Sequence, residues 1–261
     1  RNDGIDGHAH PTYGARTHAV VECFGRLRRK LAELKLAENT VIVFFSDDGG
    51  LGPVTAMKPL RGAKGMLYEG GIRVPGLVEW PAGIAAGQVT DTPAVTMDIF
   101  PTIGEIVGLD ESAYLEPLDG HSLVSVFKGF DGPRNRPIPF KCLEGAAIID
   151  DEWKLVMPDL GNGVFELYNL KNDPTETKEL TEALPDQATR MRGLWDAFNQ
   201  SREASVVAGD YPEGEVLPDP PGREDGVFWI ELPEYQAYFE AWEDRLEYQS
   251  WVERGRKQME E

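Results

Sequence analysis

The sequence predicts an α/β protein with a second, small antiparallel sheet towards its C-terminal end. Residues 16–36 place apolar side chains at helical spacing, and residues 40–45 follow as a continuous β-branched and aromatic run. Residues 146–157 and 164–170 alternate like strands, and residues 186–200 have a helical pattern. We therefore expect part of a mixed sheet flanked by helices, followed by a small antiparallel sheet with a helix across it.

The first helix and the strand after it set the position of the candidate site. The helix at 16–36 is amphipathic and stops before the run at 40–45. That run is typical of a parallel strand buried on both faces. It is followed by Ser46-Asp47-Asp48-Gly49-Gly50, so two carboxylates lie at the carboxyl end of a strand, where open α/β sheets place their sites.

Glycine and proline divide the middle of the chain. Glycines break residues 62–71 into a loop, and residues 72–80 then have the pattern of a strand. Residues 95–107 have the pattern of a helix, with Pro101 early in it, where a proline is tolerated. The stretch 129–139 is rich in Gly, Pro and Arg, which indicates a domain boundary.

Charge and composition exclude several classes of function. The 261 residues contain 26 Lys and Arg against 45 Asp and Glu, a formal charge of −19, which would repel nucleic acid and anionic membranes. Any anion site must therefore be built locally. No apolar run approaches the roughly 20 residues that a membrane span needs, and the start of the chain has neither a signal-peptide pattern nor Met. This start suits a chain whose N-terminal region is absent.

An ordered series of motifs runs through most of the chain. The longest are Asn39 to Gly50 and Pro59 to Pro75. Shorter ones stand at 80–83, 98–102, 118–123, 153–155, 166–170 and 173–176. Together they resemble the type I sulfatases, which belong to the alkaline phosphatase superfamily, and the resemblance extends from about Thr17 to Tyr211. It implies an alkaline-phosphatase-like mixed sheet.

The resemblance divides the chain into three expected parts. Residues 1–138 correspond to the C-terminal part of a sulfatase catalytic α/β domain, and residues 139–208 to a small α+β subdomain. Residues 209–261 correspond to an extended arm and a terminal helix, the helix at 235–261.

Asp47 and Asp48 are the candidate metal ligands. Carboxylate oxygens suit a hard cation such as calcium, and the resemblance implies that both residues bind calcium. The family pattern is usually Asp followed by Asn. Asp48 instead adds a negative charge and only accepts hydrogen bonds, so it should hold a divalent cation more firmly and welcome a sulfate oxygen less.

Lys64, His8 and His10 are the candidate catalytic residues. Lys64 lies between glycines and is a compact positive charge, and the resemblance implies that it binds the sulfate group and stabilises negative charge on its oxygens. The family has a His-x-Pro histidine that assists the leaving group. His8-Ala9-His10-Pro11 occupies that place, and His8 or His10 is the candidate, although neither has the usual spacing to Pro11. Arg61, Glu69 and Arg73 match the same family motif as Lys64, and we interpret them as structural, an Arg-Glu pair that pins the loop.

The nucleophile of the family is a formylglycine made in a Cys/Ser-x-Pro/Ala-x-Arg motif. Neither Cys23 nor Cys142 fits this motif, and after Ser250 the position of Pro or Ala is taken by Val252. We expect the formylglycine only in an N-terminal part that is missing here, so this chain alone should not turn over a sulfate ester.

Three functions fit these residues. The first is a calcium-dependent sulfuric ester hydrolase for a sulfated carbohydrate or aryl sulfate, periplasmic or secreted as the resemblance implies. The second is a truncated or degenerate homologue without catalysis. The third is a phosphodiester or phosphonate hydrolase of the same superfamily, since Asp48 departs from the sulfatase pattern. The sequence makes no prediction of oligomeric state.

Overall fold

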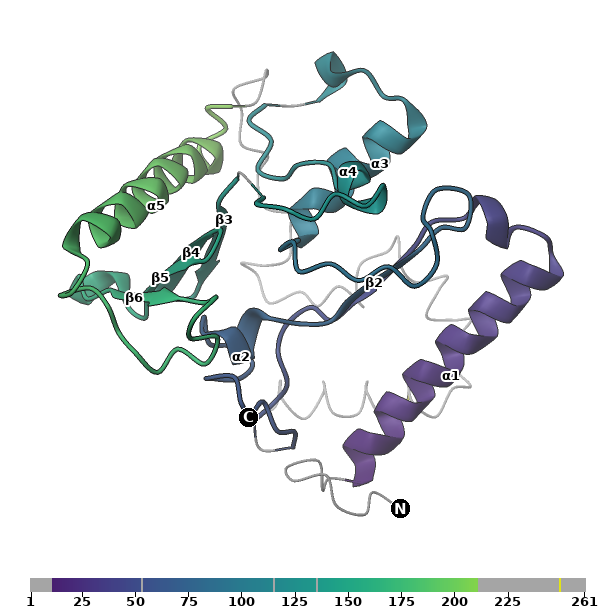
Figure 1. Ribbon diagram of the computed structural model, residues 1–261, viewed down its shortest axis with the longest axis horizontal. Coiled ribbons are helices and arrows are strands. Elements are labelled where there is room, and N and C mark those ends of the chain that lie inside the picture. Colours follow the sequence, from purple (N-terminus) through teal and green to yellow (C-terminus); the bar gives the residue numbers. More distant parts are fainter. Residues whose placement is uncertain (1–10, 53, 115, 135, 211–248, 250–261) are drawn as a thin grey trace. The chain divides into compact units, whose positions relative to one another are not determined.

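The computed structural model describes residues 11–52, 54–114, 116–134, 136–210 and 249 (Figure 1). The chain divides into two units, Arg1–Pro212 and Glu213–Glu261, and the described elements belong to the first except for Gln249. The predicted terminal helix lies outside the described residues except for Gln249, as does the predicted arm beyond residue 210. The limits of the three expected parts stay a prediction. Within the described segments, no helix combines the length and the apolar character of a membrane span.

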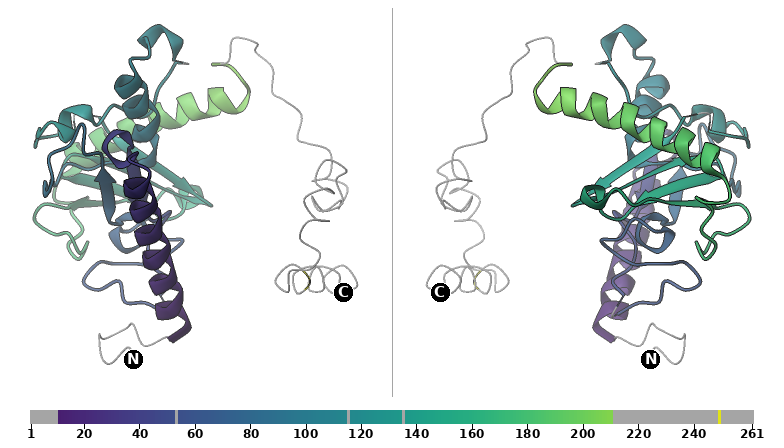
Figure 2. Two further views of the ribbon diagram at one scale, coloured as in Figure 1. Left: turned by 90° about the vertical axis from the view of Figure 1, so that its right-hand side faces the viewer. Right: turned by 90° about the vertical axis from the view of Figure 1, so that its left-hand side faces the viewer.

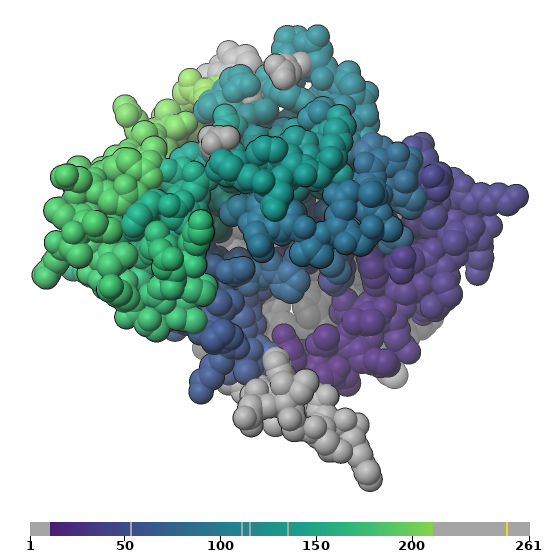
Figure 3. Space-filling view, viewed as in Figure 1, coloured from purple at the N-terminus to yellow at the C-terminus, as the bar shows by residue number. Residues whose placement is uncertain are grey.

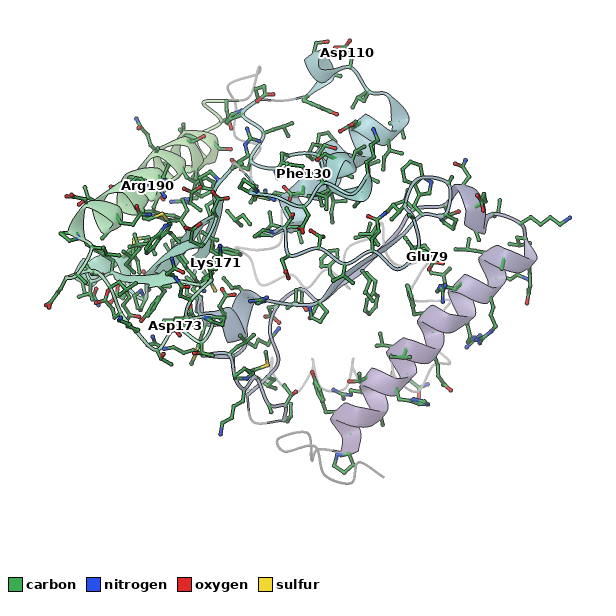
Figure 4. All side chains as sticks on the ribbon, viewed as in Figure 1. Glu79, Asp110, Phe130, Lys171, Asp173 and Arg190 are labelled. Carbon is green, nitrogen blue, oxygen red and sulfur yellow. The ribbon has the colours of Figure 1, made fainter. Side chains whose placement is uncertain are left out.

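The first helix and strand form where the sequence predicts them. Helix α1 spans Pro11–Glu33, and its first residue is a proline, which is favourable at a helix start because that N–H has no helical partner. A 3-10 turn, Ala37–Asn39, leads into β1, Ile42–Phe45. Strand β2, Gly76–Glu79, pairs with β1. Arg28 of α1 donates two hydrogen bonds to the carboxylate of Glu79, at 2.6 and 2.8 Å, and so ties the helix to the strand (Figure 4 labels Glu79).

Two expectations about β1 are wrong for the described residues. The strand pairs antiparallel with β2, with Ile42 opposite Glu79 and Phe45 opposite Gly76, rather than parallel. Its side chains are also not buried on both faces, since Phe44 and Phe45 are 36% and 38% exposed. A continuous apolar run shows that both faces of a strand can be covered, but it does not show which elements cover them. Here α1 packs against β1 through Phe24 and Phe44, whose ring centroids lie 5.0 Å apart.

The expected strand at 72–80 is shorter than the sequence predicts. Only Gly76–Glu79 pairs as a strand, while Glu69–Ile72 forms the helical turn α2. Ile72 is β-branched and favours a strand locally, but the two glycines before it allow a tight turn whose backbone is bonded to other loops.

A buried carboxylate organises the next region. The turn Thr96–Asp98 leads into α3, Ile99–Val107, which ends at Gly108 in the left-handed conformation. Two further short helices follow, η3 at Glu111–Ala113 and α4 at Val124–Phe127. Asp98 is fully buried, and its carboxylate accepts hydrogen bonds from Arg134, at 2.5 and 2.6 Å, and from the backbone N–H of His121 at 3.0 Å.

The second sheet has four antiparallel strands in chain order. They are β3 (Ile138–Cys142), β4 (Gly145–Asp150), β5 (Trp153–Met157) and β6 (Glu166–Asn169), with the 3-10 turn Leu160–Asn162 before β6. The predicted stretch 146–157 is a hairpin that turns at Asp151, and β3 is a strand that the sequence analysis places partly in a boundary. The predicted helix at 186–200 is confirmed as α5, Pro185–Val206.

The small sheet is covered on both faces. Helix α5 lies across one face, as the right-hand view of Figure 2 shows, with Met191 and Trp195 packed on Leu155. On the other face Val156 and Tyr168 pack with Leu67, which precedes α2. Figure 3 shows the segment around residue 65, in blue, against the small sheet, in green. The loop that carries Lys64 is therefore built directly on this sheet.

Replacing Asp98 tests the buried carboxylate. Burial alone would raise the pKa of Asp98, but the bonds from Arg134 and from two backbone N–H groups outweigh burial and lower it below the usual 3.8. Because the folded-state pKa is lowered, the stabilisation is present at neutral pH and is lost as the pH falls through that pKa. Asp98→Asn should cost about 3 kcal/mol at pH 7, and less near about pH 3, in urea unfolding.

The exposed Asp91→Asn is the control for this measurement, because its side chain lies at the surface and should leave the free energy of unfolding within about 0.5 kcal/mol of wild type. A cost for Asp98→Asn that does not change with pH would contradict a charged, stabilising carboxylate.

Candidate functional site

The turn after β1 holds the two adjacent carboxylates. The hydroxyl of Ser46 donates to the carbonyl of Asp48 at 2.8 Å and closes the turn. The side chain of Asp47 is 88% exposed, and that of Asp48 is 32% exposed. Asp47 is therefore open to solvent, whereas Asp48 is partly enclosed.

Lys64 lies beside this pair although it is distant in sequence. Its Nζ is 2.8 and 2.7 Å from Oδ1 and Oδ2 of Asp48, and 3.7 Å from Oδ2 of Asp47. The hydrogen bonds to Asp48 raise the pKa of Lys64, and the charge of Asp47 adds to the effect. The backbone N–H of Lys64 donates to the carbonyl of Gly50 at 3.0 Å, so main chain and side chain both fix its place.

Glycines allow three backbone segments to approach one another here. Gly49 donates to the carbonyl of Gly71 at 2.8 Å, and Gly70 donates to the carbonyl of Arg61 at 2.6 Å. A Cβ on Gly49 would lie 2.0 Å from the carbonyl oxygen of Gly70, and one on Gly71 would lie 1.9 Å from that of Met66. No side chain fits at these positions, so the turn, the Lys64 loop and α2 share one closely packed backbone core.

Arg61 fastens the Lys64 loop to the small sheet. Its guanidinium lies 3.8 Å from the centre of the Tyr68 ring and donates to the hydroxyl of Tyr168 at 2.6 Å. Both tyrosine hydroxyls donate to Glu166, at 2.9 and 2.6 Å. Burial, and then Glu166, raise the pKa of Tyr68 to about 12. These contacts support the structural interpretation of Arg61.

The remaining residues of the loop motif form ion pairs. Nη1 of Arg73 is 3.8 Å from Oε2 of Glu69, so the structure contains the expected Arg-Glu pair. Glu69 also contacts Lys154 of β5 at 2.9 Å. Lys154 is not among the residues that the sequence predicts for the site, although the short motif at 153–155 contains it and is the signal that could have identified it.

The candidate histidines His8 and His10 lie outside the described residues. The two histidines that are described are engaged elsewhere. His18 lies 3.4 Å from Glu22 on α1, and Nδ1 of His121 lies 3.7 Å from Asp98.

The donor set fits part of a hard-cation site. Asp47 and Asp48 offer up to four carboxylate oxygens, and calcium takes six to eight oxygen ligands. In the part of the chain that is described, no group of three or more His, Cys, Asp or Glu side chains could hold a metal ion. The chemistry of the pair is right for calcium, and other oxygens would have to complete the shell.

Two family models match the chain. Residues 3–109 match the model described as Sulfatase, and residues 63–203 match that of the C-terminal region of N-sulphoglucosamine sulphohydrolase. The second match alone covers more than half of the 261 residues. The two matches share residues 63–109, so both family models include Lys64.

Individual sulfatases are similar over long stretches. A sulfatase of Formosa agariphila is 30% identical over 234 residues, which cover 79% of this chain and 41% of that protein. The steryl-sulfatase of Mus musculus is 35% identical over 239 residues, covering 75% of this chain and 37% of that one. This chain therefore spans less than half the length of either relative.

A solved structure shows the same fold. The crystal structure of Ps i-CgsB in complex with k-i-k-neocarrahexaose superposes with a TM-score of 0.64 at 26% identity, over 91% of this chain and 51% of that one. This similarity confirms the predicted α/β, alkaline-phosphatase-like fold. With both family models matched in order along the sequence, the chain belongs to the sulfatase family.

Proposed function

We propose that this chain carries the calcium- and sulfate-binding half of a sulfuric ester hydrolase site. The observation that carries the proposal is the ammonium of Lys64 held between two carboxylates at the end of β1. This arrangement supports the proposal, because a cation suited to an oxyanion lies next to carboxylates suited to a hard metal. The substrate class we propose is a sulfated carbohydrate or an aryl sulfate, and the setting is periplasmic or extracellular.

Asp47 and Asp48 are the proposed calcium ligands within this chain. When bound, calcium would supply positive charge that attracts a sulfate oxygen. Asp48 is the residue that must change partner, because both of its carboxylate oxygens contact Lys64. If Asp48 binds the metal cation instead of Lys64, the ammonium of Lys64 becomes free to bind an anion.

The proposed role of Lys64 is to bind the sulfate group and to stabilise negative charge that develops on its oxygens. His8 or His10 is the proposed histidine near the leaving group. In the usual Asp-Asn pattern the second residue is neutral, whereas Asp48 keeps one more negative charge beside the anion site. Sulfate binding should therefore depend on the metal more strongly here than with asparagine.

The nucleophile of the proposed reaction lies outside these 261 residues. The chain contains no Cys/Ser-x-Pro/Ala-x-Arg motif that could become formylglycine. We propose that residues beyond this chain complete the site and that the chain alone does not hydrolyse sulfate esters. The same observation favours a second candidate, a non-catalytic homologue, and Asp48 favours a third, a phosphodiester or phosphonate hydrolase.

Calorimetry tests the metal proposal. With two carboxylates as the only proposed ligands, calcium should bind the chain with a Kd in the millimolar range, or about 4 kcal/mol. Asp47→Asn should weaken this binding further, while Asp91→Asn, also exposed and acidic, should not. Micromolar binding by the chain would contradict a divided site, and no dependence on Asp47 would contradict the ligand assignment.

Removing Lys64 tests the competition for Asp48. Lys64→Met should tighten calcium binding by about tenfold, because the metal no longer displaces an ammonium that is paired with both oxygens of its ligand. The matched control is Lys171→Met, which removes the charge of an exposed lysine that Figure 4 labels. Equal calcium affinity in both variants would show that Lys64 and the metal do not compete.

A turnover assay tests whether this chain is catalytically complete. The chain should release no nitrophenol from 4-nitrophenyl sulfate or from a nitrophenyl phosphonate, because it has no nucleophile motif. Sulfate turnover that disappears in Lys64→Met would show that the chain is catalytically complete. Faster turnover of the phosphonate than of the sulfate would overturn the sulfatase assignment.

A further inference from the structure

Turn α2 connects the turn after β1, which carries Asp47 and Asp48, to the loop that carries Lys64. The carbonyl of Gly71 accepts from Gly49, next to Asp48, and the N–H of Gly70 donates to Arg61, three residues before Lys64. The position of α2 therefore contributes to how far Lys64 lies from the two aspartates, beside the direct bond from the N–H of Lys64 to Gly50. Side chains of the small sheet also contact α2.

Lys154 of β5 is the element that reaches α2 from the small sheet. Its side chain is 0% exposed, and Nζ lies 2.9 Å from Oε1 of Glu69, the first residue of α2, and 2.7 Å from Oε1 of Glu176. The glutamate side chains are 5% and 0% exposed. Removing each charge from water costs several kcal/mol, so a triad of this kind is a poor general stabiliser and is better explained by the geometry that it specifies.

Glu176 completes the connection through its backbone and its side chain. Its Oε2 accepts from the backbone N–H of Glu69 at 2.7 Å, and its carbonyl accepts from Arg61 at 3.2 Å. Glu176 has a φ of +55°, a left-handed conformation that is unfavourable for a non-glycine residue. It therefore contacts both ends of the segment that holds Lys64, at a conformational cost that its contacts must offset.

The turn before Glu176 is held by Asp173. The carboxylate of Asp173, labelled in Figure 4, accepts from the backbone N–H groups of Thr177 and Lys178, each at 2.7 Å. Nη1 of Arg73 lies 3.8 Å from Glu69 and brings the charge of the cluster towards zero. The four ion-paired side chains, Arg73, Glu69, Lys154 and Glu176, are therefore fixed in place and together nearly neutral.

The stability of the small sheet comes mainly from its other face. Leu155 and Met157 point to α5, where they pack with Trp195. Lys154 and Val156 alternate with them and point to the Lys64 loop, as the contact of Val156 with Leu67 shows. Lys154 therefore lies on the face of the sheet opposite to the hydrophobic cluster under α5.

We propose that Lys154 is a positioning residue, whose ammonium holds Glu69 and Glu176 together and thereby sets the distance between Lys64 and the Asp47-Asp48 pair. The use of that distance, to bind metal and sulfate together, rests on the function proposed above. The small sheet is then a part of the site, because it supplies the buried cation that fixes α2.

Amide hydrogen exchange of the whole chain tests this proposal without relying on calcium. In Lys154→Met, which keeps an unbranched side chain without its terminal ammonium, the amides of Gly49 and Lys64 should exchange at least about tenfold faster. The amides between β4 and β5, such as Ile148, should keep their protection. Lys154→Arg keeps a cation and should restore slow exchange at Gly49 and Lys64.

The matched control is Arg190→Met, which breaks the ion pair of Arg190 with Asp150 on the α5 side of the sheet, 2.7 Å in wild type. This variant should leave Gly49 and Lys64 unchanged. Equal acceleration in both variants, or none in Lys154→Met, would overturn the positioning role. If Lys154→Met does not fold, Glu176→Gln carries the same expectation, because it keeps the shape of the side chain and removes one charge.

Calcium titration of the same variants separates the two proposals. If both hold, Lys154→Met tightens calcium binding, because Lys64 is no longer held against both oxygens of Asp48, and Lys154→Arg restores the wild-type affinity. If the wild-type chain binds no calcium but Lys154→Met still speeds exchange at Gly49 and Lys64, the metal assignment fails and the positioning role stands. If calcium binds to wild type and to Lys154→Met equally, and exchange is also unchanged, the positioning role fails alone.

Discussion

The hydrogen bond from Gly49 to the carbonyl of Gly71 joins the two halves of the candidate site, and it forms only because neither residue has a side chain. With a Cβ at either position the backbones would overlap, so the turn after β1 and α2 could not meet. Lys64 reaches Asp48 because its loop is bonded to both of these segments. The chemistry of the site therefore depends on a contact between main chains, and the charged side chains occupy positions that this contact has already set.

The charge of the protein makes this local arrangement necessary. A chain with a formal charge of −19 repels anions at long range, so an anion site needs a cation held in place at short range. Lys64 is such a cation, but Asp48 occupies it with both carboxylate oxygens. Asparagine in place of Asp48 would leave Lys64 less tightly held. In the proposed site, the second aspartate thus couples anion binding to any cation that can take over its carboxylate.

Sequence patterns predict which segments form helices and strands better than they predict which segments pair or pack together. Periodicity identifies α1 and α5 because it reports which face of a segment is apolar. The run at 40–45 predicts a strand but not its antiparallel partner, because pairing depends on residues distant in the chain. Asp47, Asp48 and Lys64 could be named as candidates because a long motif contains them, and their roles in a site stay a prediction. Lys154 could not, since a lysine in an alternating strand normally points to water and is almost never buried without partners.

The alternation along β5 has a consequence for how the small sheet assembles. Leu155 and Met157 belong to the α5 side, and Lys154 belongs to the side of Glu69. A slip of one residue against β4 would turn the ammonium into the apolar layer under Trp195 and leave two buried glutamates without a cation. Both errors cost several kcal/mol. The buried lysine therefore strongly disfavours any other register of β5 against β4. The sheet can form its hydrophobic layer correctly only when it also presents the ammonium of Lys154 to α2.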